Sequence, residues 1–217
     1  SQPGDLAEAL GLPEWRYAWR RSHEGVAFGN AVLSRHPIVR AEALHLPPGE
    51  DLDEQRTALL VVVDTPGGRL TVATTHLNFL WDHSHVRQLQ VTAICRWLAD
   101  RREHGAPVVL TGDLNAEPIS DEVRMLTGRA AVPVVGLGFH DAWEAAGEGD
   151  GATWSRANTH TPNPPFEGDK RIDYVLCGWP LPGGRGVPVR AELVGTTADA
   201  DAGHPSDHFG VVTDLTV

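Results

Sequence analysis

The sequence contains little cysteine and little positive charge, and it lacks a long apolar run. Its 217 residues include only two cysteines, Cys95 and Cys177. Two cysteines cannot form the dense disulfide framework of small secreted domains, so we expect buried thiols and a reducing compartment such as the cytoplasm. No apolar run approaches the roughly 20 residues of a membrane-spanning helix, and we therefore expect no transmembrane segment.

The charge balance argues against one class of binding surface. Eighteen Lys and Arg stand against 29 Asp and Glu, which gives a formal net charge of -11. Neutralising many phosphates requires a basic face, so this balance argues against a broad nucleic-acid-binding surface. It does not exclude an acidic site that binds phosphate groups, because a metal ion can supply positive charge locally.

The pattern of apolar residues predicts one α+β domain over residues 1–217. A chain of this length can bury a sizeable core, and no repeat or internal linker divides it. Strands dominate, so we expect packed sheets with helices outside them. The predicted strands cover 15–20, 25–33, 38–46, 57–64, 69–75, 108–110, 171–177, 187–194 and 209–217, and the predicted helices cover 5–10, 86–102, 120–127 and 141–146.

The predicted helix over 86–102 has an apolar stripe at roughly helical spacing. The stripe comprises Val86, Leu89, Ile94, Trp97 and Leu98. Arg87, Gln90 and Arg101 are expected on the other faces. The segment 147–168 is rich in Gly, Thr, Asn and Pro and predicts a long functional loop, with Thr153 and Trp154 as the remnant of a strand.

Polar side chains follow strand-like segments at four places. These clusters are His76-Leu77-Asn78, Gly112-Asp113-Leu114-Asn115, Arg171-Ile172-Asp173 and Ser206-Asp207-His208. Each cluster alone is explained as well by a turn, a helix cap or a satisfied polar group. Four such clusters can also converge at the rim of one sheet, where sites for hard cations and phosphates are built from Asp, Asn and His.

The order and the residue sequences of these clusters resemble the motifs of the endonuclease/exonuclease/phosphatase superfamily. The matching segments are GNAVLSRHPI, TTHLN followed by RQLQ, PVVLTGDLNAEP, RIDYVL and PSDHFGVVTDL. The resemblance implies a four-layer α/β/β/α sandwich of two packed, mostly antiparallel sheets with outer helices. It also implies a phosphoesterase that depends on Mg²⁺ or Mn²⁺.

The resemblance also implies roles for particular residues. His208, oriented by Asp173, would handle the nucleophilic water or bind the phosphate, and His76 would contact the phosphate or the leaving group. Asp113 would orient the water or help Asp207 to hold the metal, and Asn115 would donate to a phosphoryl oxygen. Asn30, Asn78 and Arg171 are candidate substrate-binding residues, although strand packing explains Asn30, and a structural ion pair explains Arg171, equally well.

One part of the family pattern has no counterpart here. Family members begin with a strand that ends in Asn, followed by a Gln-Glu pair whose glutamate is the main metal ligand. We therefore expect the domain to be incomplete at its N-terminus, with a missing segment that completes a sheet and the metal site. Glu14 and Glu24 are the only nearby carboxylates that could replace the glutamate.

Alternatives remain for the function. The leading hypothesis is hydrolysis of a phosphomonoester or phosphodiester, with a small molecule as substrate. A nuclease acting on DNA or RNA is the first alternative, and the acidic charge argues against it, although WRYAWRR supplies Arg16, Arg20 and Arg21. A non-catalytic binding module with a degenerate site is the second. The loops 77–85 and 147–170 would select the substrate, through Trp81, His83, His85, Trp154, His160 and Phe166 or by packing alone.

Overall fold

The computed structural model describes residues 1–21, 27–49, 55–162, 164 and 166–216. Glu24, one of the two candidate replacement carboxylates, lies outside these residues. The elements are α1 (Gln2–Leu10), β1 (Glu14–Arg21), β2 (Ala27–Ser34), β3 (Ile38–His45), β4 (Thr57–Thr65), β5 (Gly68–His76), α2 (Ser84–Arg101), β6 (Val108–Asp113), α3 (Asp121–Leu126), β7 (Phe139–Asp141), α4 (Ala142–Ala146), β8 (Asp173–Gly178), β9 (Pro188–Val194) and β10 (Gly210–Leu215).

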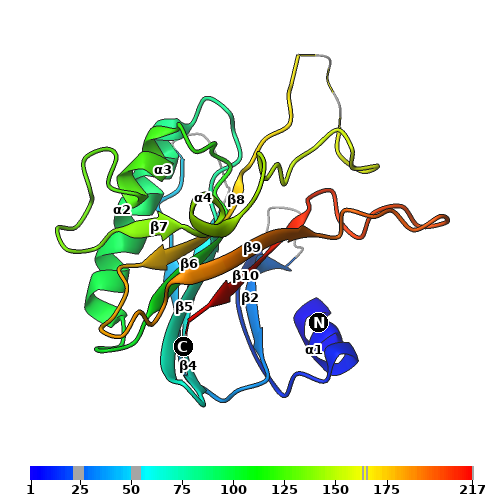
Figure 1. Ribbon diagram of the computed structural model, residues 1–217. Helices are drawn as coiled ribbons and strands as arrows, with labels where there is room; N and C mark the ends of the chain where they lie inside the picture. The colour runs from blue at the N-terminus through cyan, green and yellow to red at the C-terminus, as the bar shows by residue number, and fades with distance from the viewer. Residues whose placement is uncertain (22–26, 50–54, 163, 165, 217) are drawn as a thin grey trace.

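A six-stranded sheet with the order β3-β4-β5-β6-β8-β7 forms the centre of the fold. Neighbouring strands are antiparallel except β5 and β6, which are parallel and are joined through α2. A parallel pair requires a crossover connection, and a helix of 18 residues supplies it here. The carboxyl ends of β5 and β6 lie side by side, with His76 opposite Asp113, and Figure 1 shows both strands in the middle of the molecule.

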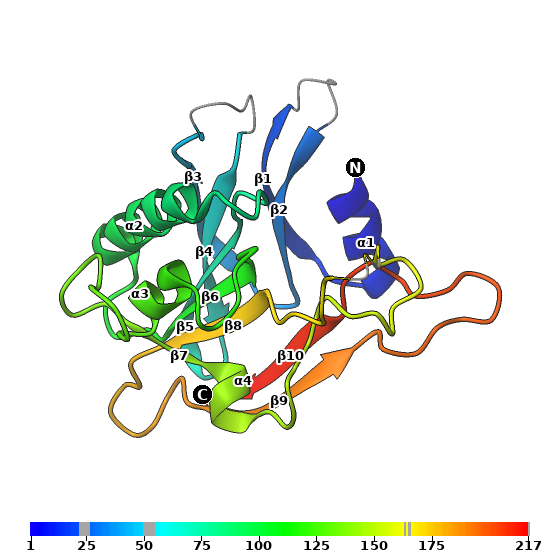
Figure 2. The same cartoon turned by 90° about the horizontal axis from the view of Figure 1, so that it is seen from above.

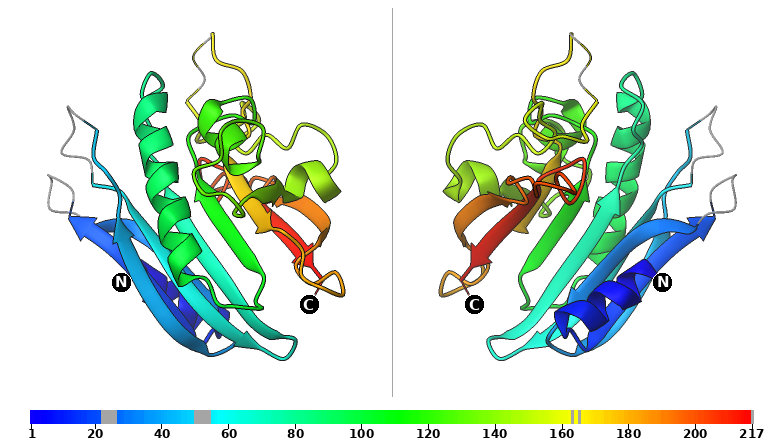
Figure 3. Two further views of the ribbon diagram at one scale, coloured as in Figure 1. Left: turned by 90° about the vertical axis from the view of Figure 1, so that its left-hand side faces the viewer. Right: turned by 90° about the vertical axis from the view of Figure 1, so that its right-hand side faces the viewer.

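Two small sheets, β1-β2 and β9-β10, cover one face of the central sheet, and α2 and α3 cover the other. Figure 2 shows α1 outside β1 and β2, so helices flank the sheets on both sides. Figure 3 shows the same layers from the two edges of the molecule. The predicted α+β sandwich with packed sheets and outer helices is confirmed.

The burial of β4 shows why the central sheet has two cores. Leu60 and Val62 face α2 in the larger core, together with Ile94 and Leu98. The alternate residues of β4 face β1 and β2 in a smaller core that includes Ala18. A strand buried on both faces has a continuous apolar sequence, which is why TALLVVVD could be predicted as a central strand.

The helix α2 departs from the predicted amphipathic pattern. Leu89, predicted in the apolar stripe, is 56% exposed, whereas Arg87 and Gln90 are 4% and 1% exposed. Arg87 forms a buried ion pair with Glu122 of α3 at 2.5 Å, and the Gln90 side chain accepts from the Asn78 amide at 2.9 Å. Specific hydrogen bonds therefore override the periodicity on this helix.

Other predicted elements need small corrections. The helix predicted at residue 5 begins at Gln2, and the three-residue strand β7 was not predicted. The proposed strand remnant is a single bridge between Trp154 and Lys170. Cys95 and Cys177 are buried free thiols, as predicted. In the part of the chain that the structure describes, no helix has the length and apolarity needed to cross a membrane.

Candidate active site

The register of three neighbouring strands places His76, Asp113 and Asp173 in one row. His76 lies opposite Asp113 in the β5-β6 pair, and Asp113 lies opposite Asp173 in the β6-β8 pair. Residues directly opposite each other point to the same face of a sheet. This row therefore lies at one end of the central sheet, on the face that β1-β2 and β9-β10 cover.

Gly112 allows β5 and β6 to approach closely beside this row. It has a φ of 138°, and a Cβ atom there would lie 1.8 Å from the carbonyl oxygen of Thr75. No side chain can occupy that space. The glycine of the GDLN motif is therefore required by the packing that brings Asp113 next to His76.

His208 reaches the same row from the loop before β10. Its Nδ1 atom lies 2.7 Å from Oδ2 of Asp173, and both side chains are about one-quarter exposed. Burial alone would lower the pKa of His208. The hydrogen bond and negative charge of Asp173, helped by Asp113 and Asp207, outweigh burial and raise this pKa above 6.5.

The pKa of His76 shifts in the direction opposite to that of His208. Nε2 of His76 lies 3.3 Å from Oδ2 of Asp113. Burial, and then the positive charges of Arg56 and His208, lower the pKa of His76 to about 3. Burial, and then the neighbouring Asp173 carboxylate, raise the pKa of Asp113 to about 6. At neutral pH the site therefore contains a neutral imidazole at His76 and a carboxylate at Asp113 that is easily protonated.

Asn115 closes the turn after β6. It has a φ of 48°, a left-handed conformation that asparagine tolerates better than most residues. Its amide donates to Oδ1 of Asp113 at 2.7 Å, and its side-chain nitrogen donates to the Leu77 carbonyl at 3.1 Å. Asn115 thus joins the segment carrying Asp113 to the segment carrying His76.

The donor set at this site fits a divalent cation. One ligand atom from each of Asp113, Asp173 and His208 lies within 4.8 Å of the other two. Two carboxylates in such a group provide the oxygen donors that Mg²⁺ and Mn²⁺ prefer. Within the described residues this group does not include Asp207, the other predicted metal ligand, which is exposed and accepts from Ser206 at 3.3 Å.

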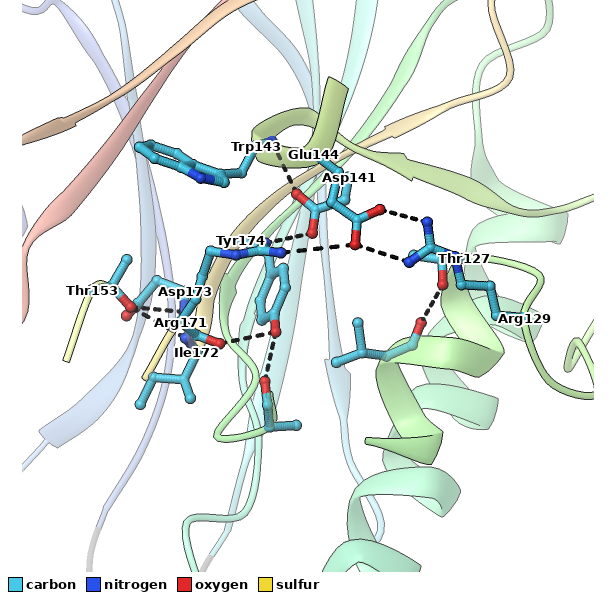
Figure 4. Close-up of polar contacts among 12 residues, drawn as sticks. Thr127, Arg129, Asp141, Trp143, Glu144, Thr153, Arg171, Ile172, Asp173 and Tyr174 are labelled. Carbon is cyan, nitrogen blue, oxygen red and sulfur yellow. Dashed lines mark hydrogen bonds and ion pairs between the residues drawn. The ribbon is translucent and has the colours of Figure 1, made fainter. Parts of the chain in front are cut away.

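Three residues predicted to bind substrate are engaged within the protein. The Asn30 side chain donates to the Thr57 carbonyl at 2.8 Å. Asn78 is 1% exposed, and its side chain accepts from the Leu80 amide. Arg171 is buried and pairs with Asp141 of α4 (Figure 4). These contacts favour the packing and ion-pair alternatives for Asn30 and Arg171, and a structural role for Asn78.

Glu14 is not placed to replace the absent glutamate. It begins β1 and pairs with Arg16 at 3.4 Å. In the β1-β2 register, the residue opposite Phe28 is Arg20, and the Phe28 ring lies 5.5 Å from the His76 ring. Glu14 precedes Arg20 by six residues, which is roughly 20 Å along a strand.

Sequence reasoning missed Arg56. This side chain is 5% exposed, and its guanidinium lies 5.2 Å from the ring centre of Phe28 and 5.8 Å from that of Phe79. It is close enough to lower the pKa of both His76 and Asp113. A single arginine before a strand gives no sequence signal, because only the fold brings it to the end of β5.

The loop aromatics divide between the site and the surface. The Trp154 ring meets His208 edge-on, with ring centres 4.9 Å apart. Trp81 and Phe166 are 88% and 86% exposed, and the rings of His83 and His85 lie 5.5 Å apart. Of the aromatic residues proposed to line a substrate pocket, Trp154 therefore contacts the candidate active site directly.

Curated proteins with a similar sequence include a phosphodiesterase. Tyrosyl-DNA phosphodiesterase 2 from Xenopus laevis is 27% identical over 189 residues, which cover 86% of this chain and 48% of that protein. The chain thus spans about half the length of this curated relative.

Solved structures share the fold at lower identity. D. rerio TDP2 complexed with single-strand DNA product superposes with a TM-score of 0.75 at 20% identity, over 99% of this chain and 81% of that chain. A mannosyl-6-phosphatase, Bt3783 of Bacteroides thetaiotaomicron VPI-5482, gives a TM-score of 0.73 at 19% identity, over 100% and 81%. The model of the Endonuclease/Exonuclease/phosphatase family matches residues 2–208, and the chain belongs to that family.

Proposed function

We propose that this protein hydrolyses phosphate esters with the help of Mg²⁺ or Mn²⁺. The observation that carries the proposal is the convergence of Asp113, Asp173 and His208 from three separate segments of the chain. Membership of the Endonuclease/Exonuclease/phosphatase family supports it. Hydrolysis of a phosphate ester requires an activated water, charge stabilisation at the phosphoryl oxygens and help for the leaving oxygen.

His208 and Asp173 activate the water or stabilise the phosphoryl group. Because Asp173 accepts from Nδ1 of His208, the proton is held at Nδ1 and Nε2 is left free for the substrate side. The same carboxylate stabilises the imidazolium that forms when Nε2 takes a proton. Asp173 therefore sets both the tautomer and the basicity of His208.

Asp113 and Asp173 would hold the cation, and Asp207 could join them only by moving closer. When bound, the cation would supply positive charge to the phosphoryl oxygens and lower the pKa of a bound water. His76 is neutral at physiological pH because of its low pKa, so it can donate a hydrogen bond but does not carry charge. Arg56, whose positive charge reaches His76 and Asp113, adds to the positive potential of the site.

A substrate panel with metal exchange tests the proposal. The full chain would be assayed on p-nitrophenyl phosphate, bis(p-nitrophenyl) phosphate, sugar phosphates and oligonucleotides, with Mg²⁺, Mn²⁺ or EDTA. We expect hydrolysis that EDTA abolishes and that Asp173→Asn, which keeps the size of the side chain, reduces at least about a hundredfold. If no phosphate ester is hydrolysed with either metal, the binding-module alternative is favoured instead.

A phosphodiester on nucleic acid is the second candidate substrate. It is favoured by the similarity to tyrosyl-DNA phosphodiesterase 2 and to D. rerio TDP2 complexed with single-strand DNA product. The net charge of -11 opposes it, because electrostatic attraction to phosphates supplies most non-specific affinity. Comparing a tyrosyl-linked oligonucleotide with a sugar phosphate at two salt concentrations separates the two substrate classes. Nucleic-acid binding predicts a steep loss of activity with salt, and a small phosphomonoester predicts little.

A further inference from the structure

Asp173 and His208 lie on segments that no strand pairing joins. Asp173 begins β8, which pairs with β6 and β7, whereas His208 precedes β10, which pairs with β9. Among the described strands, no ladder connects β8 to β10. The short contact between Asp173 and His208 is therefore not fixed by strand pairing.

Thr153 contacts both segments. Its Oγ1 atom accepts from the backbone amides of Ile172 and Asp173, each at 3.2 Å (Figure 4). Its carbonyl accepts from the amide of Phe209, next to His208, at 2.8 Å. Thr153 is 0% exposed, so water cannot replace these bonds. One residue thus links the backbone of Asp173 to the backbone beside His208.

Two residues after Thr153 form further hydrogen bonds with the backbone just before His208. The side-chain nitrogen of Asn158 donates to the Ser206 carbonyl at 2.9 Å, and Oγ1 of Thr161 donates to the Asp207 carbonyl at 2.7 Å. Asn158 and Thr161 are 1% and 6% exposed. A polar loop would normally point such side chains into solvent. Here they are turned inward onto the two residues that precede His208.

From these contacts we propose that residues 153–161, which we name the clamp segment, position His208 against Asp173. Thr153 and Thr161 are positioning residues, because their contacts are to the backbone around Asp173 and His208. The inference rests on the proposed function only for its kinetic consequence. A small displacement of His208 from Asp173 is costly because catalytic groups act only at close, aligned contact.

Isosteric variants test the clamp segment. Thr153→Val and Thr161→Val remove one hydroxyl with little change of volume, and Thr153→Ser and Thr161→Ser restore it. Thr71→Val is the matched control, because Thr71 is also 0% exposed and its Oγ1 accepts from the Glu103 amide at 3.1 Å. Thr71 lies five residues from His76 along β5, so loss of its hydroxyl affects a partly buried hydrogen bond away from the site.

The kinetic measurement uses bis(p-nitrophenyl) phosphate with Mg²⁺ or Mn²⁺. We expect each clamp valine variant to lower kcat about ten- to a hundredfold with KM changed less than about threefold, on the scale of misplaced catalytic groups. The serine variants should recover most of the activity, and Thr71→Val should keep it. Wild-type kcat in both clamp valine variants would overturn the proposal.

A second measurement does not depend on activity. Amide hydrogen exchange would be followed in peptides covering 204–209 and, for comparison, 57–65. We expect the clamp valine variants to raise exchange in 204–209 selectively, and Thr71→Val to leave it unchanged. Equal increases of amide exchange in both peptides, or no increase in 204–209, would overturn the proposed role of the clamp segment. If the wild-type chain hydrolyses no phosphate ester, the proposed function fails and this exchange measurement alone decides on the clamp.

Discussion

The buried ion pair between Arg171 and Asp141 gives a prediction whose magnitude follows from the structure. The two side chains are 7% and 1% exposed. Oδ1 of Asp141 caps α4 by accepting from the Trp143 amide at 2.9 Å, and the Arg171 guanidinium lies 5.1 Å from the ring centre of Tyr174. Arg171→Met keeps much of the side-chain volume but leaves the Asp141 carboxylate buried without its cation.

The expected loss is large for a domain of this size. Removing one partner of a buried ion pair costs about 3–5 kcal/mol, against a typical total stability of about 5–15 kcal/mol. For 217 residues this corresponds to a fall in Tm of roughly 6–20 °C. The double variant Arg171→Met/Asp141→Asn should recover most of the loss, because it removes both charges and keeps a side-chain oxygen to cap α4.

Chemical denaturation of the wild type, of Arg171→Met, of Asp141→Asn and of the double variant completes a double-mutant cycle. It measures the coupling free energy between Arg171 and Asp141, which we expect to be at least about 2 kcal/mol. Arg129→Met is the control, since Arg129 forms a bidentate ion pair with Glu144 at 2.8 and 2.6 Å but is 56% exposed. It should cost less than about 1 kcal/mol. Additive effects in the cycle, or an Arg171→Met variant with native stability and a raised KM, would refute this reasoning and support the substrate-binding role.

Three further predictions concern the site and the thiols. His208→Ala or Asp113→Ala should lower turnover at least about a hundredfold with an unchanged circular dichroism spectrum, and near-normal rates in either variant would contradict the proposed roles. Because the pKa of Asp113 is about 6, its protonation below that pH competes with a cation, so calorimetry should show Mn²⁺ affinity falling between pH 7 and pH 5, by up to about tenfold per unit. An affinity independent of pH would place the cation elsewhere. Burial raises the pKa of Cys95 to about 12 and that of Cys177 to about 11, so both thiols should resist a thiol reagent until the chain is unfolded, and fast labelling at pH 7 would contradict this.

The fold was predictable wherever burial leaves a pattern in the sequence. The strand β4 is apolar on both faces, and the turn after it contains two glycines, so its position in the centre of a sheet and its hairpin with β5 followed from the residues alone. The strand β7 was missed because three residues, only two of them buried, are too few to show a period. The error on α2 has a different cause, since Arg87 and Gln90 are buried for their hydrogen bonds.

Several residues of the candidate site could be named from the sequence, but Arg56 and most contacts could not. His76, Asp113 and Asp173 end or begin strands, and their alignment depends on strand register, which the hydrophobic pattern determines. Arg56 reaches the site by tertiary packing alone. Arg171 follows the same motif as Asp173, but the partner that explains its burial is Asp141, which lies 30 positions away.

The clamp segment shows which contacts cannot be predicted from sequence. It lies within the segment 147–168, whose composition of Gly, Thr, Asn and Pro correctly indicates a region without regular structure. Such a composition also suggests that the region is exposed. Two of its polar side chains, Asn158 and Thr161, are buried because their partners are backbone carbonyls 48 and 46 positions away. Every residue type has a backbone carbonyl, so no particular pair of residue types in the sequence predicts the contact. A loop of this kind can therefore be recognised as structural only after the fold has brought both segments together, although Thr153 and Thr161 are as buried as the aliphatic core.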